Sequence, residues 1–371
     1  MSSFSRNDLS YMQMALTLAA RGRGHTAPNP MVGAVVVKDG RVVGRGFHAR
    51  AGDHHAEIVA MREAGEAAAG STLYVSLEPC SHHGKTPPCT RAIVEAGVKR
   101  VVAAMRDPNP LVNGKGIEAL REAGVHVEVG CLEEQARRLN EFFVTFHELG
   151  RPFVTLKWAM TLCGRTSHDS GQSRWISCAE SRDHGHRLRS LHDAVMVGIG
   201  TVLMDDPMLN VRLAGYTGQQ PRRIVIDGDL SMPTRARLLR ERRKGEVILF
   251  TTPFAKQSQI DYFEGEGCRV VVVPSKRRII DLRLVVAELH KLGVMSVLVE
   301  GGRQIHTALI ANQLADKLHV FLSPKLIGGC QLRNPVEDLG VPGMDQALPI
   351  HEMTFQSIGS DICIEGYLRK I

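Results

Sequence analysis

The chain reads Leu77-Glu78-Pro79-Cys80-Ser81-His82-His83-Gly84-Lys85-Thr86-Pro87-Pro88-Cys89, preceded across one apolar, strand-like segment by His55-Ala56-Glu57. One imidazole and two thiolates form a soft ligand set that leaves the fourth position of tetrahedral zinc open, as catalytic zinc requires. A carboxylate beside that opening can move protons to and from metal-bound water. The stretch therefore predicts His55, Cys80 and Cys89 as zinc ligands and Glu57 as a general acid and base.

Each piece of this pattern also has an ordinary interpretation. A lone His-Ala-Glu at a helix start is usually a solvated first turn, and two cysteines nine positions apart are more often buried thiols. A closed structural zinc site needs four protein ligands, and His82 or His83 could supply the fourth. The order of the residues favours a zinc deaminase, whose pattern is H-x-E followed by P-C-x-x-C, although eight residues separate the cysteines here.

Composition and charge limit the class of protein. The 371 residues suffice for two or three domains, with 43% hydrophobic and 23% charged residues. The first residues lack the apolar core of a signal peptide, and eight scattered cysteines indicate reduced thiols, so we expect a cytoplasmic protein without membrane contact. The net charge of +7 gathers at 240–244 and 276–278 without interleaved aromatic residues, which argues against nucleic-acid binding.

The first half alternates strands and helices, which predicts a three-layer α/β domain. Asp8 is expected to cap a helix that runs to about Arg21, and Asp39-Gly40 to turn a hairpin. The expected helices are 8–21, 55–69, 89–97 and 116–123, and the expected strands are 32–37, 42–46, 73–77, 98–105 and 126–129.

The second half is expected to be a separate α/β domain. A helical connector over 133–149 is broken by Gly150-Arg151-Pro152, which predicts domains at 1–150 and 151–371. The expected strands of the second domain are 153–160, 194–197, 223–226, 247–250, 270–273, 296–299 and 318–322, and its expected helices are 179–191, 282–292 and 304–311.

The segment Pro79–Cys89, with its G-K-T-P-P-C ending, resembles the bifunctional riboflavin-biosynthesis deaminase/reductase family, as do Pro28-Asn29-Pro30 and Gly46-Phe47-His48. The resemblance implies a cytidine-deaminase-like fold and a diaminopyrimidinone substrate that carries a phosphoribosylamino group. It also implies substrate contacts at positions of the first half that match the family pattern: Asn29, His48, His82, Lys85, Asp107 and Asn109. Asp107-Pro108-Asn109-Pro110 is also consistent with a simple turn.

Two glycine-bearing turns, at 198–201 and 300–303, mark the second half, but neither completes a dinucleotide-binding G-x-G-x-x-G pattern. Their surroundings resemble the reductase half of the same family, which implies a dihydrofolate-reductase-like fold and NADPH. The resemblance implies cofactor contacts at Ala159, Trp175, Thr201, Asp205 and Gly302, and substrate contacts at Ser173, Arg189, Leu209, Arg212 and Glu300.

The residue types are consistent with the implied chemistry. Arg189 and Arg212 can hold a ribose phosphate through bidentate hydrogen bonds. Lys157 and Glu300 are our candidates for ring opening and proton delivery in the reduction, and charge pairing within the core is the alternative for Lys157.

We therefore expect a two-domain enzyme that uses Zn2+ to deaminate 2,5-diamino-6-(5-phosphoribosylamino)pyrimidin-4-one and NADPH to reduce the ribosyl group of the product to ribityl. The expected partners are this small molecule and further copies of the chain, without nucleic acid or membrane. One alternative is a nucleic-acid-editing zinc deaminase with an accessory binding domain. Another is a binding protein with a structural zinc ion.

Overall fold

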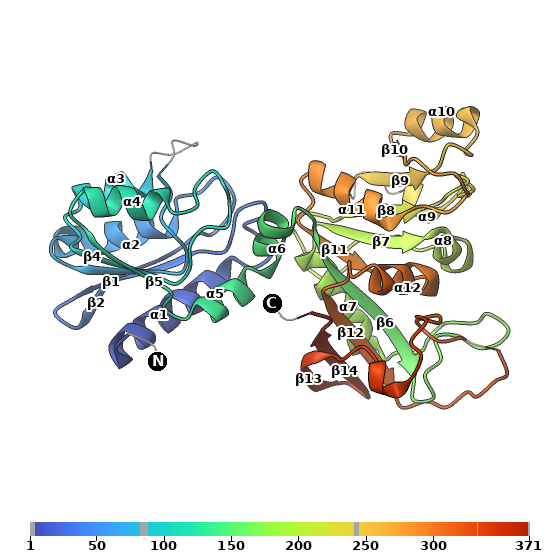
Figure 1. The fold of residues 1–371 in the computed structure, drawn as a ribbon. Coiled ribbons are helices and arrows are strands. Elements are labelled where there is room, and N and C mark those ends of the chain that lie inside the picture. The colour runs from blue at the N-terminus through green and yellow to red at the C-terminus, as the bar shows by residue number, and fades with distance from the viewer. Residues whose placement is uncertain (1–3, 82–87, 241–244, 332, 370–371) are drawn as a thin grey trace. The chain divides into compact units, whose positions relative to one another are not determined.

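The computed structural model describes residues 4–81, 88–240, 245–331 and 333–369. The chain divides into two compact units, Met1–Gly150 (unit 1) and Arg151–Lys370 (unit 2). Each contains one sheet, and the predicted α/β class is confirmed (Figure 1). Among the described residues, no helix combines the length and the apolar character needed to cross a membrane.

Unit 1 has a five-stranded sheet in the order β2-β1-β3-β4-β5, with β2, β1 and β3 antiparallel and β3, β4 and β5 parallel. Buried side chains of α2, α3 and α4 pack on one face, and those of α1, α5 and α6 on the other, so the predicted three-layer arrangement is confirmed. The strands are Gly33–Lys38 (β1), Arg41–Phe47 (β2), Thr72–Val75 (β3), Arg100–Ala103 (β4) and His126–Val129 (β5). The helices are Arg6–Ala19 (α1), Ala56–Ala64 (α2), Cys89–Glu95 (α3), Lys115–Glu122 (α4), Glu133–Leu139 (α5) and Glu141–Leu149 (α6).

Close packing of β2 on α2 fixes the start of the helix that carries Glu57. A Cβ atom on Gly46 would lie 2.2 Å from the carbonyl oxygen of Ala56, and one on Gly44 would lie 2.1 Å from that of Ala60. Only glycine permits this approach. The two glycines of β2 therefore hold the N-terminal turn of α2 against the sheet.

Several boundaries in unit 1 differ from the sequence prediction, and three of these differences have a clear local cause. Asp8 does not cap α1: Ser5 is the N-cap, and Asp8 completes a capping box from the third helical position. Helix α2 ends at Ala64 because Gly65 adopts a φ of 54°. The connector over 133–149 is two helices separated by Asn140, whose side chain bonds to both the backbone N–H and the carbonyl of Met31.

Unit 2 has a nine-stranded sheet in the order β10-β9-β8-β7-β11-β6-β12-β14-β13, parallel from β10 through β12 and antiparallel at β14 and β13. The strands are Phe153–Thr161 (β6), Ala194–Gly198 (β7), Arg222–Ile226 (β8), Val247–Thr251 (β9), Arg269–Val272 (β10), Ser296–Val299 (β11), Lys317–Ser323 (β12), His351–Ile358 (β13) and Asp361–Tyr367 (β14). The helices are Ala179–Leu191 (α7), Ile199–Asp205 (α8), Arg237–Arg240 (α9), Gln257–Gly265 (α10), Leu282–Lys291 (α11) and Arg303–Ala311 (α12).

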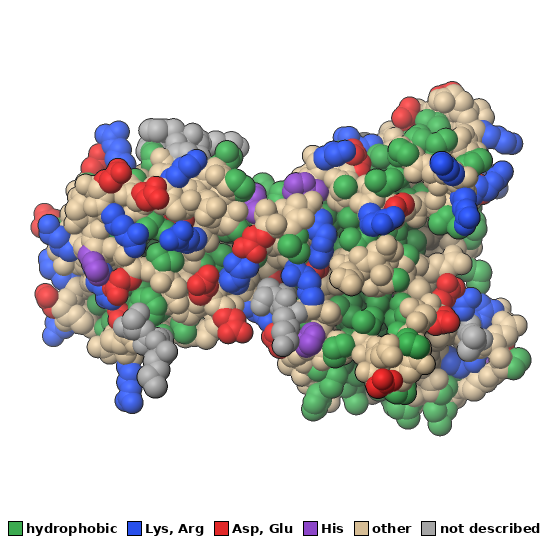
Figure 2. Space-filling model, viewed as in Figure 1, with side chains coloured by type: hydrophobic (Ala, Val, Ile, Leu, Met, Phe, Trp, Pro, Cys, Tyr) green, Lys and Arg blue, Asp and Glu red, His purple; other side chains and the backbone are tan. Residues whose placement is uncertain are grey.

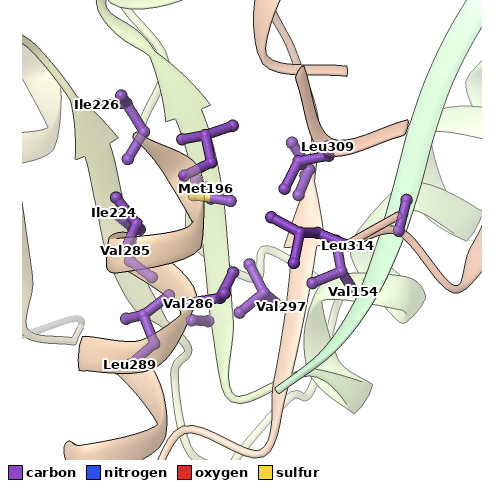
Figure 3. Packing of buried hydrophobic residues seen from close by; sticks show 14 of the residues in the cluster. Val154, Met196, Ile224, Ile226, Val285, Val286, Leu289, Val297, Leu309 and Leu314 are labelled. Atoms are coloured by element: carbon purple, nitrogen blue, oxygen red, sulfur yellow. The ribbon is translucent and has the colours of Figure 1, made fainter. Parts of the chain in front are cut away.

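Apolar side chains of α11 and α12 form the larger core of unit 2 against one face of its sheet (Figure 3). Val285 and Leu289 of α11 and Leu309 of α12 face Met196 and Val297 of the central strands. The strands of this face are apolar almost throughout, as expected of parallel strands covered on both sides. The sequence analysis did not predict β13, β14, α8, α9 or α10.

Candidate active sites in the two units

The three predicted zinc ligands meet in unit 1. The Nδ1 atom of His55 lies 3.1 Å from the sulfur of Cys89 and 3.6 Å from that of Cys80. His55 is the N-cap of α2, Cys89 is the first residue of α3, and Cys80 follows β3. Two of the three ligands thus lie at helix starts and the third in the loop after β3, and the three ligand atoms lie within 4.8 Å of one another.

This donor set fits zinc. Zn–N and Zn–S bonds of about 2.1 and 2.3 Å at a tetrahedral angle place nitrogen and sulfur about 3.6 Å apart. The observed separations of 3.1 and 3.6 Å between the imidazole nitrogen and the two sulfurs lie close to that value. Hydrogen bonding by Cys89 and His55 lowers the pKa of Cys80 to about 4, whereas the hydrogen bond to Cys80 and burial raise the pKa of Cys89. Cys80 is therefore the thiolate of the pair, and zinc binding has to release the proton of Cys89. Among the described residues, these three form the complete His/Cys/Asp/Glu group at this site.

Glu57 is buried beside the ligands, with 3% of its surface exposed. It lies in the first turn of α2, as predicted. Burial raises the pKa of Glu57, and Cys80 adds to this effect while His55 opposes it. The carboxyl group is thus placed to exchange a proton with a reactant at the zinc site.

His48 and Asn29, predicted as substrate contacts, form one hydrogen-bonded pair next to His55. The Nδ1 atom of His48 lies 3.2 Å from the carbonyl oxygen of His54 and therefore donates to it, so Nε2 accepts from the amide of Asn29 at 3.0 Å. Burial lowers the pKa of His48, which maintains this neutral form. Its ring meets that of His55 edge-on at 5.6 Å between centroids. The two predicted contacts are therefore adjacent to the zinc ligands.

Glu78 is a residue of this site to which the sequence analysis assigned no role. Its carboxylate is 3% exposed and accepts hydrogen bonds from the backbone N–H groups of Asp107, Gly114, Gly116 and Ile117, at 2.9 to 3.3 Å. Three of these donors lie at the start of α4, where a carboxylate is favoured. Glu78 thus ties the segment 107–117 to the backbone two residues before Cys80. The sequence feature that could have identified Glu78 is its position two residues before the predicted zinc ligand Cys80.

Asp107 and Asn109 follow β4 and form the predicted turn: Asp107 accepts from the N–H of Asn109 at 2.8 Å. Burial raises the pKa of Asp107 to about 6, and Glu78 and Cys80 contribute to this rise while the Asn109 hydrogen bond opposes it. Asp107 also lines a surface hollow of about 470 Å3. His82 and Lys85, the other two predicted contacts of this half, lie outside the described residues.

The predicted residues of unit 2 gather where three neighbouring parallel strands end. Strands β7, β11 and β6 are adjacent in the sheet. Thr201 and Asp205 lie in α8 after β7, Glu300 and Gly302 follow β11, and Ala159 is near the end of β6. The carboxyl ends of parallel strands are the usual ligand-binding edge of an open α/β sheet.

The two glycine-bearing turns contact each other at this edge. The N–H of Gly302 donates to the hydroxyl of Thr201 at 3.2 Å, and the N–H of Gly198 donates to the carbonyl of Gly301 at 3.2 Å. A Cβ atom on Gly301 would lie 2.8 Å from the Thr201 hydroxyl. The predicted cofactor positions Thr201 and Gly302 are therefore in direct contact, with α12 beginning at Arg303.

Ser173, Trp175 and Asp205 form a second part of this edge. The hydroxyl of Ser173 donates to the carboxylate of Asp205 at 2.9 Å. Trp175 is 62% exposed, and the guanidinium of Arg182 lies over its ring at 4.5 Å from the centroid. A large exposed indole ring beside cationic side chains offers a stacking surface for a planar ligand.

Glu300 is held by Arg189 in a bidentate ion pair, with distances of 2.5 and 2.7 Å, and the remaining Arg189 nitrogen donates to the carbonyl of Asn210 at 2.9 Å. Burial alone would raise the pKa of Glu300, but Arg189 and then Lys157 outweigh it and hold this pKa at about 2. Burial lowers the pKa of Lys157, whose ammonium lies 5.5 Å from the centroid of the Phe321 ring. Among the described residues, Lys157 has no carboxylate partner within 4 Å.

Arg212 and Leu209 lie beyond α8. Arg212 is exposed and donates to the side-chain oxygen of Asn210 at 2.8 Å. The side chain of Leu209 is 1% exposed and belongs to the core, so only its backbone, at a φ of 54°, can meet a ligand. Asn210, which the sequence analysis did not single out, links the two arginines through its carbonyl and its side chain. Burial, Arg189 and Arg212 lower the pKa of nearby His186 to about 4.

Family models match both units. Residues 152–364 match the RibD C-terminal domain, and residues 5–105 match the cytidine and deoxycytidylate deaminase zinc-binding region. The second match covers all three residues of the zinc group and Glu57.

Relatives match nearly the whole chain. The riboflavin biosynthesis protein RibD of Aquifex aeolicus is 42% identical, covering 96% of this chain and 97% of that protein, and RibD of Escherichia coli is 39% identical, covering 96% and 98%. The structure of Acinetobacter baumannii RibD matches with a TM-score of 0.87 at 37% identity, covering 98% of this chain and 99% of that one. A Thermotoga maritima structure, described as a diaminohydroxyphosphoribosylaminopyrimidine deaminase/5-amino-6-(5-phosphoribosylamino)uracil reductase, matches with a TM-score of 0.81 at 36% identity, covering 97% and 98%. The chain belongs to the RibD family of riboflavin biosynthesis enzymes, with a zinc-binding deaminase region and a reductase domain.

Proposed function

We propose that unit 1 removes the 2-amino group of 2,5-diamino-6-(5-phosphoribosylamino)pyrimidin-4-one by hydrolysis, and that unit 2 reduces the ribosyl group of the resulting 5-amino-6-(5-phosphoribosylamino)uracil to ribityl with NADPH. The Thermotoga maritima structure, described with both activities, supports this substrate. A nucleic-acid-editing deaminase with an accessory binding domain is not favoured, because residues 152–364 match the RibD C-terminal domain.

The deamination assigns distinct work to the residues of unit 1. His55, Cys80 and Cys89 would hold zinc, which supplies a Lewis acid that makes water nucleophilic at neutral pH. Glu57 accepts a proton from the attacking water and returns it to the 2-amino nitrogen, so that the exocyclic C–N bond breaks, a C=O bond forms at that carbon and ammonia leaves. Asn29 and His48 orient the pyrimidine beside His55, and His82, Lys85, Asp107 and Asn109 are the further proposed substrate contacts.

The edge of β7, β11 and β6 supports the cofactor proposal. Gly302 leads into α12, and a helix N-terminus favours anionic groups such as the phosphates of NADPH. Thr201 and Asp205 line the same edge, Trp175 offers its exposed ring, and Ala159 leaves room on β6. NADPH, when bound, supplies hydride to the sugar C1.

Arg189 and Glu300 define the acid–base part of the reductase proposal. Since Glu300 occupies two donors of Arg189 and Asn210 a third, Arg189 positions Glu300, and contact with the substrate phosphate is assigned to Arg212. Ser173, Leu209 and Glu300 complete the proposed substrate contacts. Lys157, whose pKa is lowered by burial, is the proposed proton donor for ring opening.

The observation that carries the deaminase proposal is Glu57, buried beside the three zinc ligands. In Glu57→Gln we expect the zinc content to remain at the wild-type level and ammonia release to fall by roughly 100- to 10,000-fold. The reductase should still reduce 5-amino-6-(5-phosphoribosylamino)uracil at the wild-type rate when this compound is supplied directly. Loss of zinc from this variant, or full deaminase activity, would contradict the assignment.

A homo-oligomer is also proposed, with the β13 edge of unit 2 as its contact. The apolar side chains of Met353 and Phe355 on this edge strand are 60% and 76% exposed, and Ile362 on β14 is 42% exposed. Hydrophobic side chains gather over this part of unit 2 (Figure 2). An exposed apolar edge strand is a template for pairing with another chain. The eight free cysteines support a reducing, cytoplasmic location.

A further inference from the structure

Unit 2 contains a second group of metal-ligating side chains, to which no role was assigned above and which adjoins Lys157, the partner of His319 across β6 and β12. His184 of α7, His319 of β12 and Cys363 and Glu365 of β14 place one ligand atom each within 4.8 Å of all the others. We call these four residues the α7 cluster.

The sheet register brings three members of the α7 cluster together. On the antiparallel pair β12–β14, His319 is opposite Glu365, and Phe321 is opposite Cys363. Alternate residues of a strand share one face, so these side chains lie on one side of the sheet. Leu188 of α7 packs on Phe321 and Cys363 from this side. The ring of His184, one turn before Leu188, lies 5.7 Å from that of Phe321 and completes the group from the helix.

The buried Nδ1 atom of His319 is an independent indication that this group binds a ligand. His319 is 5% exposed, and its buried Nδ1 has no hydrogen-bond partner among the described residues. The nearest carboxylate oxygen, Oε1 of Glu365, lies 3.5 Å away. A buried imidazole nitrogen without a partner is costly, and a metal ion would satisfy it.

One thiolate and one carboxylate would balance the charge of a divalent ion, beside the ammonium groups of Lys317 and Lys157. The ammonium nitrogen of Lys317 lies 3.4 Å from Oε2 of Glu365, whereas Oε1 of the same carboxylate lies nearest to His319. Burial lowers the pKa of His319 and of His184, so both imidazoles are neutral, as ligands must be. Burial raises the pKa of Cys363 to about 12, so metal binding there has to release the thiol proton.

We propose that the α7 cluster is a second zinc site, which joins α7 to β12 and β14. Two imidazoles, one thiolate and one carboxylate form a closed tetrahedral set of the structural kind. Zinc would bring these ligand atoms, which lie within 4.8 Å of one another, to separations of about 3.6 Å. His184 and Glu365 are half-buried and admit the ion from the surface.

The test compares zinc content in untagged full-length protein after dialysis against a weak chelator. We expect about two zinc ions per chain in the wild type, and about one in Cys80→Ser/Cys89→Ser, which lacks the unit 1 site. His319→Ala/Cys363→Ser should likewise retain about one, whereas Cys330→Ser, which removes an exposed thiol of unit 2, should retain about two.

The Cys80→Ser/Cys89→Ser variant tests the second zinc site even if substitutions in the α7 cluster prevent folding. Both tryptophans, Trp158 and Trp175, lie in unit 2, so their fluorescence reports whether unit 2 is folded. With native emission, this variant should still bind Co2+ with a thiolate-to-cobalt charge-transfer band. Native emission without zinc and without that band overturns the proposal. This outcome is independent of deaminase or reductase activity.

Discussion

Glu78→Gln tests how the deaminase site is held together. In the wild type, both carboxylate oxygens accept from backbone N–H groups: Oε2 from Asp107 and Gly114, and Oε1 from Gly116 and Ile117. Glutamine keeps one oxygen and places an NH2 group against the other pair of donors. Two buried N–H groups therefore lose their acceptor, whichever way the amide is oriented.

The expected cost follows from those two donors. Each buried donor left without an acceptor costs about 1–3 kcal/mol, so unit 1 should lose about 2–6 kcal/mol of its free energy of unfolding. That is a large fraction of the stability of a domain, which is about 5–15 kcal/mol. The segment 107–117 should be released first, so the KM of the deaminase should rise before its zinc is lost.

Urea unfolding provides the assay, because the two units can be followed separately. Tryptophan fluorescence reports unit 2 alone, and deaminase activity and zinc release report unit 1. Glu95→Gln is the matched control, since Glu95 forms an exposed pair with Arg91 and should leave unit 1 unchanged. The reasoning is refuted if Glu78→Gln unfolds unit 1 at the same urea concentration as Glu95→Gln with an unchanged KM.

Three further predictions concern unit 2. Arg212→Ala should raise the KM for the phosphorylated reductase substrate by roughly 10- to 100-fold, through loss of about 1.5–3 kcal/mol of charged hydrogen bonding, and an unchanged KM rejects the phosphate contact. Burial lowers the pKa of His192 from 6.5 to about 4, so the unfolded chain takes up a proton first as the pH falls. His192 alone should therefore contribute a loss of about 3 kcal/mol to the stability of unit 2 between pH 7 and below pH 4, seen as an earlier fluorescence transition in urea, and His192→Gln should reduce the total loss by about this amount. Phe355→Asp should convert the oligomer to a monomer in light scattering, and an unchanged mass excludes the β13 edge as the contact.

The zinc group was predictable because its residue types and order carry the chemistry directly. His55, Glu57, Cys80 and Cys89 lie at helix starts and a strand end that the apolar pattern also predicts. The helix break at Asn140 was not predictable in this way, since it depends on hydrogen bonds to Met31, more than a hundred residues away. The helix propensities of residues in a short stretch of sequence contain no information on such a tertiary contact.

Fewer features of the reductase half could be predicted from the sequence. Strand β13 is exposed along most of its length and so lacks the alternation of buried and exposed residues that marks a half-buried strand. The ion pair between Arg189 and Glu300 joins α7 to the end of β11. The family pattern identified each of these residues, but it did not show that they contact each other. The roles of Glu78 and Asn210 depend on backbone groups of distant segments, which residue types do not reveal.

The most direct test of the two-step proposal is incubation of the zinc-loaded protein with 2,5-diamino-6-(5-phosphoribosylamino)pyrimidin-4-one, with and without NADPH. Without NADPH, we predict one equivalent of ammonia and the ribosylaminouracil product. With NADPH, the ribityl product should accumulate with one equivalent of NADPH oxidised. Absence of ammonia release from protein that contains zinc would contradict the account.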